Sequence, residues 1–454
     1  MRDESSTASR VADPGIRDLY TLDRRWQAWL DVEAALARAQ AEIGMIPAEA
    51  ATAISAAAHL SQMDRSRIDE AFRRTAHTLV PLIWELSEQV GEPHGGWVHW
   101  GATTQNIMEA GDLLVLREVH AILRGQIETV LDHLVQLAER TADMPMAGRT
   151  HGQHAVPITF GYKVAGWVDQ LVRQLERMDD ASPRIFQVPL GGAAGTFASL
   201  GADGRRCQEA LARELGMTAR DVPSRAIMDA GAENVLLMAM LAAVCSRIGR
   251  EVYELMKTEF GEVEEPVPPG TVGSSTMPQK RNPKFAQDIV FYAADIRAQV
   301  PLALEAVQTE HEADRTTHLM LSQAECRVSV VAGDMLARMI ELFAGLELHP
   351  DRMRENLDRS GGLIMAEAVM LDLGRQIGRQ HAHDVVYDAA QATVVEKRPF
   401  SELLRADSRV SEHLDPAAIE ALLDPTAYTG LCAEMARSAG TQVRRYLAGR
   451  PATV

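Results

Sequence analysis

A long run of apolar residues spaced three and four positions apart constrains this chain most strongly. It lies between Asp112 and Arg140. Apolar residues recur at Leu113, Leu116, Leu123, Ile127, Val130, Leu134 and Leu137, and His120 occupies one position of the same face. This spacing places the apolar side chains on one face of a single long helix, which must bury that face against other helices.

Two further segments predict long helices. One is expected to begin near Pro157, because proline suits a first helical turn, and to bury Phe160 and Trp167. Another, from Val235 to Met256, is apolar around most of its circumference and must be covered on most sides. Aromatic residues make up only 5% of the chain, and no segment shows sustained period-two alternation. We therefore expect an all-α protein with a long central helical bundle, of a kind shared between subunits of a homo-oligomer.

Helix-breaking residues divide the chain into three expected helical domains. Glycine and proline gather between Gly91 and Gly101, and the pattern changes again near Pro350. The expected domains are an N-terminal helical domain (1–100), the central bundle (101–350) and a small C-terminal helical domain (351–454). The loop 264–283 is unusually long and polar for a compact helical protein, and loops of that kind are often lids.

Charge and cysteine usage exclude several classes of function. A formal net charge of -17 opposes nucleic-acid binding, which needs a basic field. There is no apolar run of ~20 residues, so no membrane span is predicted, and the polar N-terminus lacks the apolar core of a secretory signal. The four scattered cysteines have no C-x-x-C spacing, which predicts reduced thiols in a cytoplasmic protein and no metal site. Because the net charge is negative, an anionic substrate would need local cationic or N–H donors in its binding site.

Three segments carry side chains suited to chemistry. The loop 273–283, GSSTMPQKRNP, combines Ser274 with Lys280, and a serine beside a lysine can be acidified enough to act as a base. A solvated linker is the alternative. In the second segment, His151 and His154 could act as acid–base groups, anion donors or helix caps, and no third ligand completes a metal site. The third segment, 103–106, could either bind an anion or simply cap the long helix.

Together these segments resemble the three signature regions of the fumarase/aspartase superfamily. The loop matches the pattern G-S-S-x-M-P-x-K-x-N-P throughout. Within the superfamily the chain looks most like 3-carboxy-cis,cis-muconate cycloisomerases and then adenylosuccinate lyases, through VHWGATTQN, PLGGAAGTFASLG, LDRSGGLIMAEAV and LLDPTAYTG. The resemblance implies a three-domain subunit in a homotetramer. It also implies active sites shared between three subunits, a small dicarboxylate substrate and no cofactor.

The resemblance also implies roles for individual residues. Ser274 matches the base that removes a proton alpha to a carboxylate, giving an aci-carboxylate that Lys280 and Asn282 would stabilise. His151 matches a histidine that orients substrate or helps to protonate the leaving group. The matched carboxylate-binding positions are Thr103, Thr104 and Thr150. The further substrate-binding candidates in these segments are Gln105, Asn106, Gln153, His154, Ser275 and Met277.

One more candidate comes from outside the signature segments. Arg173 follows His151 on the next predicted helix and lies on roughly the same helical face as Lys163 and Gln170. A basic residue on an otherwise apolar helix could bind a carboxylate or nitro group, or form an ion pair within the bundle.

Departures from the family patterns narrow the function. His151 is retained where bacterial cycloisomerases typically carry tryptophan, and Asn106 stands where aspartate is usual. Residues 16–20 do not show the Arg-Tyr pair expected of a nucleotide-binding adenylosuccinate lyase. The leading hypothesis is β-elimination from a small substituted succinate, releasing fumarate and an amine, ammonia or nitrite. The alternatives are a lactonising carboxymuconate cycloisomerase and a catalytically silent structural oligomer, against which the intact Ser274 and Lys280 argue.

Overall fold

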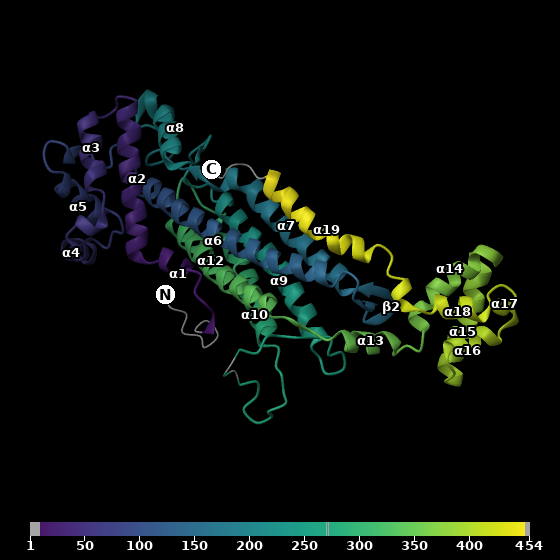
Figure 1. Cartoon of the computed structure of the whole chain (residues 1–454). Coiled ribbons are helices and arrows are strands. Elements are labelled where there is room, and N and C mark those ends of the chain that lie inside the picture. Colours follow the sequence, from purple (N-terminus) through teal and green to yellow (C-terminus); the bar gives the residue numbers. More distant parts are fainter. Residues whose placement is uncertain (1–9, 269, 271, 450–454) are drawn as a thin grey trace.

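Long helices running side by side form the centre of the molecule. The computed structural model describes residues 10–268, 270 and 272–449. The bundle helices are α6 (Thr104–Arg140), α7 (Phe160–Ile185), α9 (Asp229–Leu255), α10 (Lys284–Ala298) and α12 (Arg315–Ala344), with the short α11 (Val300–Ala306) between the last two (Figure 1). The expected all-α class is confirmed.

The periodic segments become buried helices, as predicted. Leu123, Ile127 and Leu134 of α6 are fully buried, and this helix of 37 residues is about 55 Å long. Helix α9 buries most of its apolar residues but leaves Leu236 and Met240 42% and 48% exposed. An apolar helix with an uncovered side is what a bundle shared between subunits would present.

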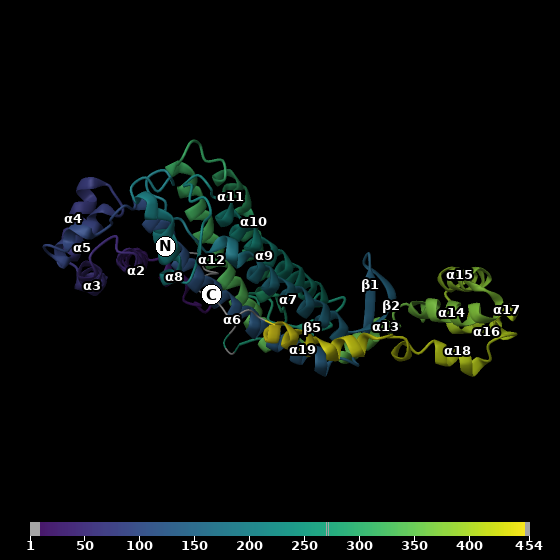
Figure 2. The same cartoon turned by 90° about the horizontal axis from the view of Figure 1, so that it is seen from above.

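Smaller helical units lie at the two ends of the bundle (Figures 1 and 2). At one end are α1 (Ile16–Leu19), α2 (Leu22–Glu42), α3 (Ala48–Ala57), α4 (Arg65–Thr75), α5 (Val80–Val90) and α8 (Gly204–Leu215). At the other are α13 (Pro350–Asp358), α14 (Ala366–Ile377), α15 (Arg379–Glu396), α16 (Phe400–Ala406), α17 (Ser408–Ser411) and α18 (Pro416–Leu422). The final helix, α19 (Cys432–Gly449), returns along α7.

Two main hydrophobic cores underlie this arrangement. One runs continuously from the N-terminal helices through the bundle, and the second lies among α14 to α18. The predicted domain boundaries at 100 and 350 stay predictions. Among the described residues, no helix is long and apolar enough to cross a membrane.

A β-hairpin replaces the helix start expected near Pro157. Strands β1 (Pro145–Thr150) and β2 (Gln153–Thr159) pair antiparallel, and Pro157 lies opposite Ala147 within them. Helix α7 therefore begins later, at Phe160. The helix predicted here is confirmed and buries Phe160 and Trp167. Only the placement of Pro157 in its first turn was wrong, because proline is also tolerated in a strand with an open edge.

The remaining strands are two residues long. These are β3 (Gln187–Val188) with β4 (Thr218–Ala219), and β5 (Val263–Glu264) with β6 (Glu347–Leu348). The second pair ties the chain after α9 to the chain after α12. This ladder therefore fixes the point from which the loop 264–283 leaves the bundle.

Candidate active site

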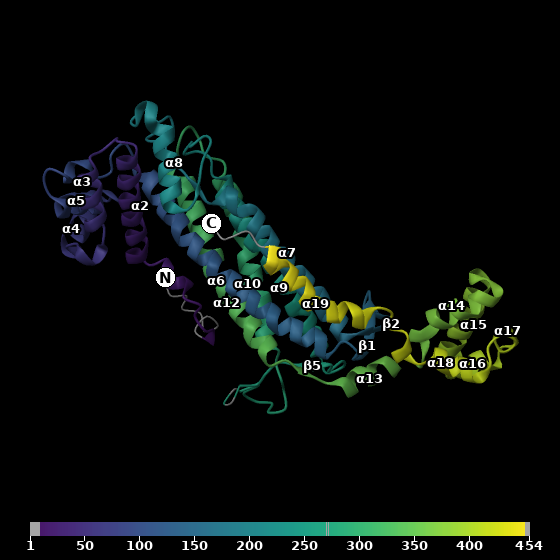
Figure 3. The same ribbon diagram turned by 45° about the horizontal axis from the view of Figure 1, so that its top comes forward.

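The loop that carries Ser274 is fastened at its base and projects from the bundle (Figures 1 and 3). The buried carboxylate of Glu265 accepts hydrogen bonds from the backbone N–H groups of Phe285 and Ala286, at 2.9 and 2.6 Å. These donors belong to the first turn of α10, where a negative charge is favoured. Closer to the tip, Asn282 Nδ2 donates to the carbonyl of Gly273 at 2.9 Å. Both ends of the predicted catalytic segment are thus held together.

Ser274 accepts two backbone hydrogen bonds within the loop. The N–H groups of Thr276 and Met277 donate to its Oγ at 3.4 and 3.1 Å. Hydrogen bonds to the charged form of a group favour that form, so these donors lower the cost of an alkoxide at Ser274. Lys280 is exposed and has no ion-pair partner within the part of the chain that the structure describes. The loop therefore presents a hydroxyl that accepts two backbone N–H groups, together with an exposed lysine.

His151 lies at the tip of the β1–β2 hairpin. Thr150 pairs with Gln153, so His151 and Gly152 form a two-residue turn, with φ of 52° and 76°. Both values are left-handed, as tight hairpin turns require. Asparagine or glycine would be commoner at the first position, which is occupied here by an exposed histidine. The signal for this turn in the sequence is Gly152 directly after His151, because glycine favours a left-handed turn position.

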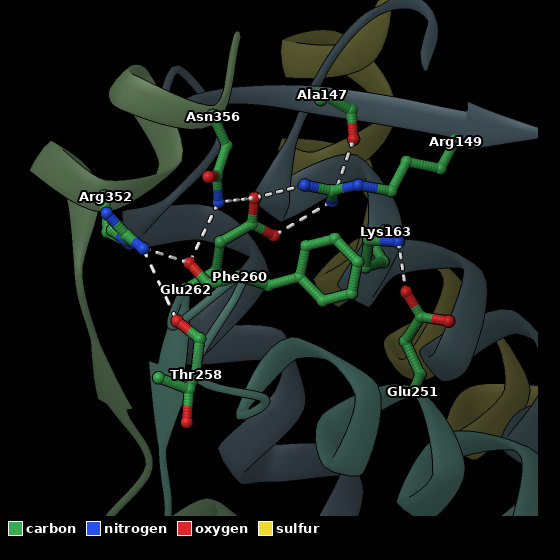
Figure 4. Close-up of polar contacts among 9 residues, drawn as sticks. All are labelled: Ala147, Arg149, Lys163, Glu251, Thr258, Phe260, Glu262, Arg352 and Asn356. Atoms are coloured by element: carbon green, nitrogen blue, oxygen red, sulfur yellow. Dashed lines mark hydrogen bonds and ion pairs between the residues drawn. The ribbon is translucent and has the colours of Figure 1, made fainter. Parts of the chain in front are cut away.

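A buried ionic cluster supports the hairpin (Figure 4). Arg149 of β1 donates two hydrogen bonds to the carboxylate of Glu262, at 2.6 and 3.0 Å. Asn356 of α13 donates to the same carboxylate at 2.7 Å and to the carbonyl of Phe260 at 2.9 Å. The side chain of Glu262 is 0% exposed. The Arg149 guanidinium also lies over the Phe260 ring, 4.7 Å from its centroid.

This cluster joins the two segments that carry His151 and Ser274. Arg149 lies two residues before His151, and Glu262 directly precedes β5, from which the Ser274 loop departs. The cluster also affects His154, the cross-strand partner of Arg149. Burial first, and then the charge of Arg149, lower the pKa of His154. We conclude that the hairpin and the base of the loop share one rigid support.

At the far end of α6, Asn106 is engaged entirely with backbone groups. Its Oδ1 accepts from the N–H groups of Thr103 and Gly192, both at 3.1 Å, and its Nδ2 donates to the carbonyl of Pro189 at 2.8 Å. The residue is 3% exposed. An aspartate would lack the Nδ2 donor that holds the Pro189 carbonyl. The geometry therefore gives Asn106 a structural task, and its predicted substrate contact stays a prediction.

Thr104 and Gln105 line a cavity of about 520 Å³ between α6, α12 and the loop before α9. Residues that the sequence analysis did not assign to the site, Arg225 and Glu325, line the same cavity, as do Arg315 and His318. Arg225 and Glu325 stand outside the signature segments, and no spacing along the chain marks them.

Within one chain the three segments do not meet. Thr104 begins α6 and the His151 hairpin follows its other end, so roughly the full length of about 55 Å separates them. The Ser274 loop projects from the bundle away from the α6 N-terminus (Figures 1 and 3). Arg173 pairs with Asp169 on α7, with its side chain 43% exposed, and is not brought to any of the three. No group of three metal-ligating side chains occurs among the described residues.

Comparison with known proteins identifies the family. A lyase family profile matches residues 8–297, and the profile described as adenylosuccinate lyase C-terminus matches residues 362–439. The chain belongs to the fumarase/aspartase superfamily of lyases. The resemblance carried by the Ser274 loop is thereby confirmed, and the protein is a lyase of this superfamily.

Relatives of this lyase have different activities. The chain is 36% identical to an N-acetyl-S-(2-succino)cysteine lyase of Enterococcus italicus, over 96% of this chain and 94% of the relative. It is 37% identical to a 3-carboxy-cis,cis-muconate cycloisomerase of Pseudomonas aeruginosa, over 91% of each. The crystal structure of a fumarate lyase from Mesorhizobium sp. BNC1 matches with a TM-score of 0.86 and 37% identity, covering 97% of this chain and 98% of that one. Overall similarity therefore does not decide the substrate.

Proposed function

We propose that this lyase releases fumarate from a 2-substituted succinate by β-elimination. The Ser274 alkoxide takes a proton from the carbon alpha to one carboxylate, and the electron pair left behind forms an aci-carboxylate. That pair then becomes the carbon–carbon double bond as the bond to the leaving group breaks. The leaving group departs with the bonding electrons and, if it is an amine, takes a proton from His151. The products are fumarate and the leaving group, which is protonated if it is an amine.

One observation carries this proposal: Ser274 Oγ accepts the N–H groups of Thr276 and Met277. A serine is a poor base unless its anion is stabilised. Lys280, exposed six residues later and without a carboxylate partner among residues 10–268, 270 and 272–449, supports charge stabilisation on the substrate carboxylate. This local cationic and N–H-rich loop also offsets the net charge of -17 for an anionic substrate.

The separation of the three segments supports a site assembled from several copies of the chain. We propose a homotetramer in which each site takes the Ser274 loop, the His151 hairpin and the Thr104 helix end from three different subunits. Large apolar side chains are exposed along the bundle, where neighbouring subunits would cover them. They are Leu236 and Met240 of α9, Phe291 of α10, Leu304 of α11 and Leu319 of α12.

The leaving group is proposed to be joined through nitrogen, because His151 can supply the proton that an amine needs. Sulfur is the second candidate, since a relative that covers nearly the whole chain is named for a succinate bonded to the sulfur of cysteine. A thiolate is a better leaving group than an amine and needs less help from His151. Lactonisation of carboxymuconate is the remaining enzymatic alternative, supported by the cycloisomerase relative.

The test is a panel of reactions run in the direction of addition. The enzyme is incubated with fumarate plus ammonia, nitrite, simple amines or simple thiols, and separately with carboxymuconate. We expect an adduct with an amine or a thiol, detected as loss of fumarate absorbance and by mass. Rapid lactone formation with no adduct from any donor would replace elimination with the cycloisomerase reaction. No turnover in any arm would favour a structural oligomer.

A further inference from the structure

The cavity beside Thr104 and Gln105 is lined by charged side chains of both signs. Four arginines and four acidic residues line it. Two of the arginines are neutralised: Arg25 pairs with Asp112 at 2.6 Å, and Arg220 pairs with Glu109 at 2.9 Å. The other two, Arg225 and Arg315, have no carboxylate within ion-pair distance among the described residues. We infer that this cavity holds the leaving group of the substrate, and that Arg225 and Arg315 select a leaving group that carries its own carboxylate.

Arg225 is fixed in place while part of its guanidinium stays available. Its Nε donates to Gln105 Oε1 at 2.7 Å, and its Nη1 donates to the carbonyl of Ala193 at 2.5 Å. Burial lowers the pKa of Arg225, which is the cost of holding a guanidinium without a counter-ion. A substrate carboxylate would supply that counter-ion through a charge-assisted hydrogen bond.

The same contacts determine the protonation state of His318. Arg225 has only donors, so Gln105 Oε1 faces Arg225 and Gln105 Nε2 donates to His318 Nε2. His318 must then be neutral, with its proton on Nδ1. A pKa of His318 lowered by burial agrees with this state. The chain Arg225–Gln105–His318 therefore leaves the Nδ1–H of His318 as its remaining hydrogen-bond donor.

The acids that remain do not cancel the surplus charge. Asp314 is engaged as the N-cap of α12, accepting from Thr316 N at 2.8 Å. Burial, and then the neighbouring Asp112 and Glu109, raise the pKa of Glu325 to about 8. Glu325 is therefore mostly protonated at pH 7 and can donate a hydrogen bond instead of repelling an anion. Outside the two ion pairs and Glu325, Arg225 and Arg315 therefore have only the carboxylate of Asp314 against them in the cavity lining.

The size of the cavity agrees with a leaving group of several heavy atoms. Its volume of about 520 Å³ falls within the range of small-molecule sites, about 300–1,000 Å³. Ammonia or nitrite would leave most of it empty, and ammonia would also leave Arg225 without a counter-ion. The substrate class is accordingly a succinate joined to a small acid through nitrogen or sulfur. This inference rests on the proposed elimination and adds the identity of the leaving group to it.

The experiment compares leaving groups that differ only in a carboxylate. Fumarate is added with N-acetylcysteine or with N-acetylcysteamine, and in a second pair with glycine or methylamine. In each addition the donor loses its S–H or N–H proton and the substrate carbon gains one. We expect the wild-type kcat/KM to favour the acid by about 10- to 100-fold, the range of one charge-assisted hydrogen bond.

Three variants test whether Arg225 and Arg315 cause the preference for the acid donor. Arg225→Gln and Arg315→Gln should each lower kcat/KM for the acid donor more than for its neutral counterpart, so that the preference falls several-fold. The side chain of Arg315 makes no hydrogen bond or ion pair among the described residues, so its variant is expected to fold normally. Arg213→Gln, on the exposed side of α8 and outside the cavity, is the control and should keep the wild-type preference.

The possible results distinguish a failure of the proposed carboxylate preference from a failure of the proposed elimination. Equal kcat/KM for acid and neutral donors in the wild type would overturn the inference while leaving elimination intact. An equal loss for both donors in Arg225→Gln would also overturn it, because Arg225 would then bind the succinyl half. Absence of adducts from every donor would overturn the proposed elimination itself.

Discussion

Replacing Glu262 with alanine should destabilise the protein far more than a nearby substitution of the same kind. Glu262 is fully buried and accepts three hydrogen bonds, two from Arg149 and one from Asn356. Removing one partner of a buried ion pair strands the other, at a cost of about 3–5 kcal/mol. Unfolding entropy is about 2.1 cal/mol/K per residue, so over 454 residues each kcal/mol corresponds to about 1 °C. The expected fall in Tm is therefore about 3–5 °C.

Glu251→Ala provides the matched control. Glu251 accepts from Lys163 at 2.5 Å close to the Arg149 cluster, but its side chain is 34% exposed (Figure 4). A partly exposed pair of this kind contributes about 0–1 kcal/mol. Thermal unfolding is followed by circular dichroism at one fixed protein concentration, because oligomer stability depends on concentration. Equal Tm values for the two variants would refute the idea that the Arg149–Glu262 cluster is the rigid support of the hairpin.

Three further predictions follow from the site. Asn106→Ala should lower the free energy of unfolding by about 1–3 kcal/mol, because it leaves the Pro189 carbonyl and two N–H groups unpaired; urea unfolding measures it, and an unchanged midpoint would contradict it. The pKa of Glu325 is raised to about 8 in the folded protein, against a usual 4.5, so ionisation of this buried group destabilises the folded protein. The destabilisation is absent below about pH 4.5 and complete above about pH 8. Glu325→Gln should therefore gain Tm relative to wild type as pH rises from 5 to 8, and a constant difference would refute this sign. His151→Asn keeps a residue suited to the left-handed turn, so it should fold normally and reduce kcat by about 10²-fold or more with amine leaving groups but less with thiols; an equal loss for both would exclude His151 as the acid.

Local sequence patterns predicted much of the fold. The spacing of residues such as Leu123 and Leu134 predicted α6, because helix burial is periodic along the chain. The β1–β2 hairpin escaped prediction, since Pro157 fits an open strand edge as well as a first helical turn. The prediction used only the preference of proline for a first helical turn, whereas Pro157 lies in β2 and pairs with Ala147.

The site was only partly predictable for a different reason. The Ser274 loop is contiguous in sequence, so its hydroxyl, lysine and asparagine could be found as a motif. The cavity draws Gln105 from α6, Arg225 from the loop before α9 and His318 from α12. Packing alone brings these three together, and one sequence carries no periodic sign of it. Arg173 illustrates the converse, because its position on a helical face did not reveal its pairing with Asp169.

Turnover of Ser274→Ala tests the central claim most directly. The rate of fumarate release from the best adduct of the donor panel is measured for wild type, Ser274→Ala and the control Ser275→Ala. General-base catalysis contributes about 10²–10⁴-fold. We therefore predict a loss of at least about 10²-fold in kcat for Ser274→Ala, with an unchanged oligomer, and a much smaller loss for Ser275→Ala. A Ser274→Ala enzyme that keeps kcat within a few-fold of wild type would contradict the assignment of Ser274 as the base.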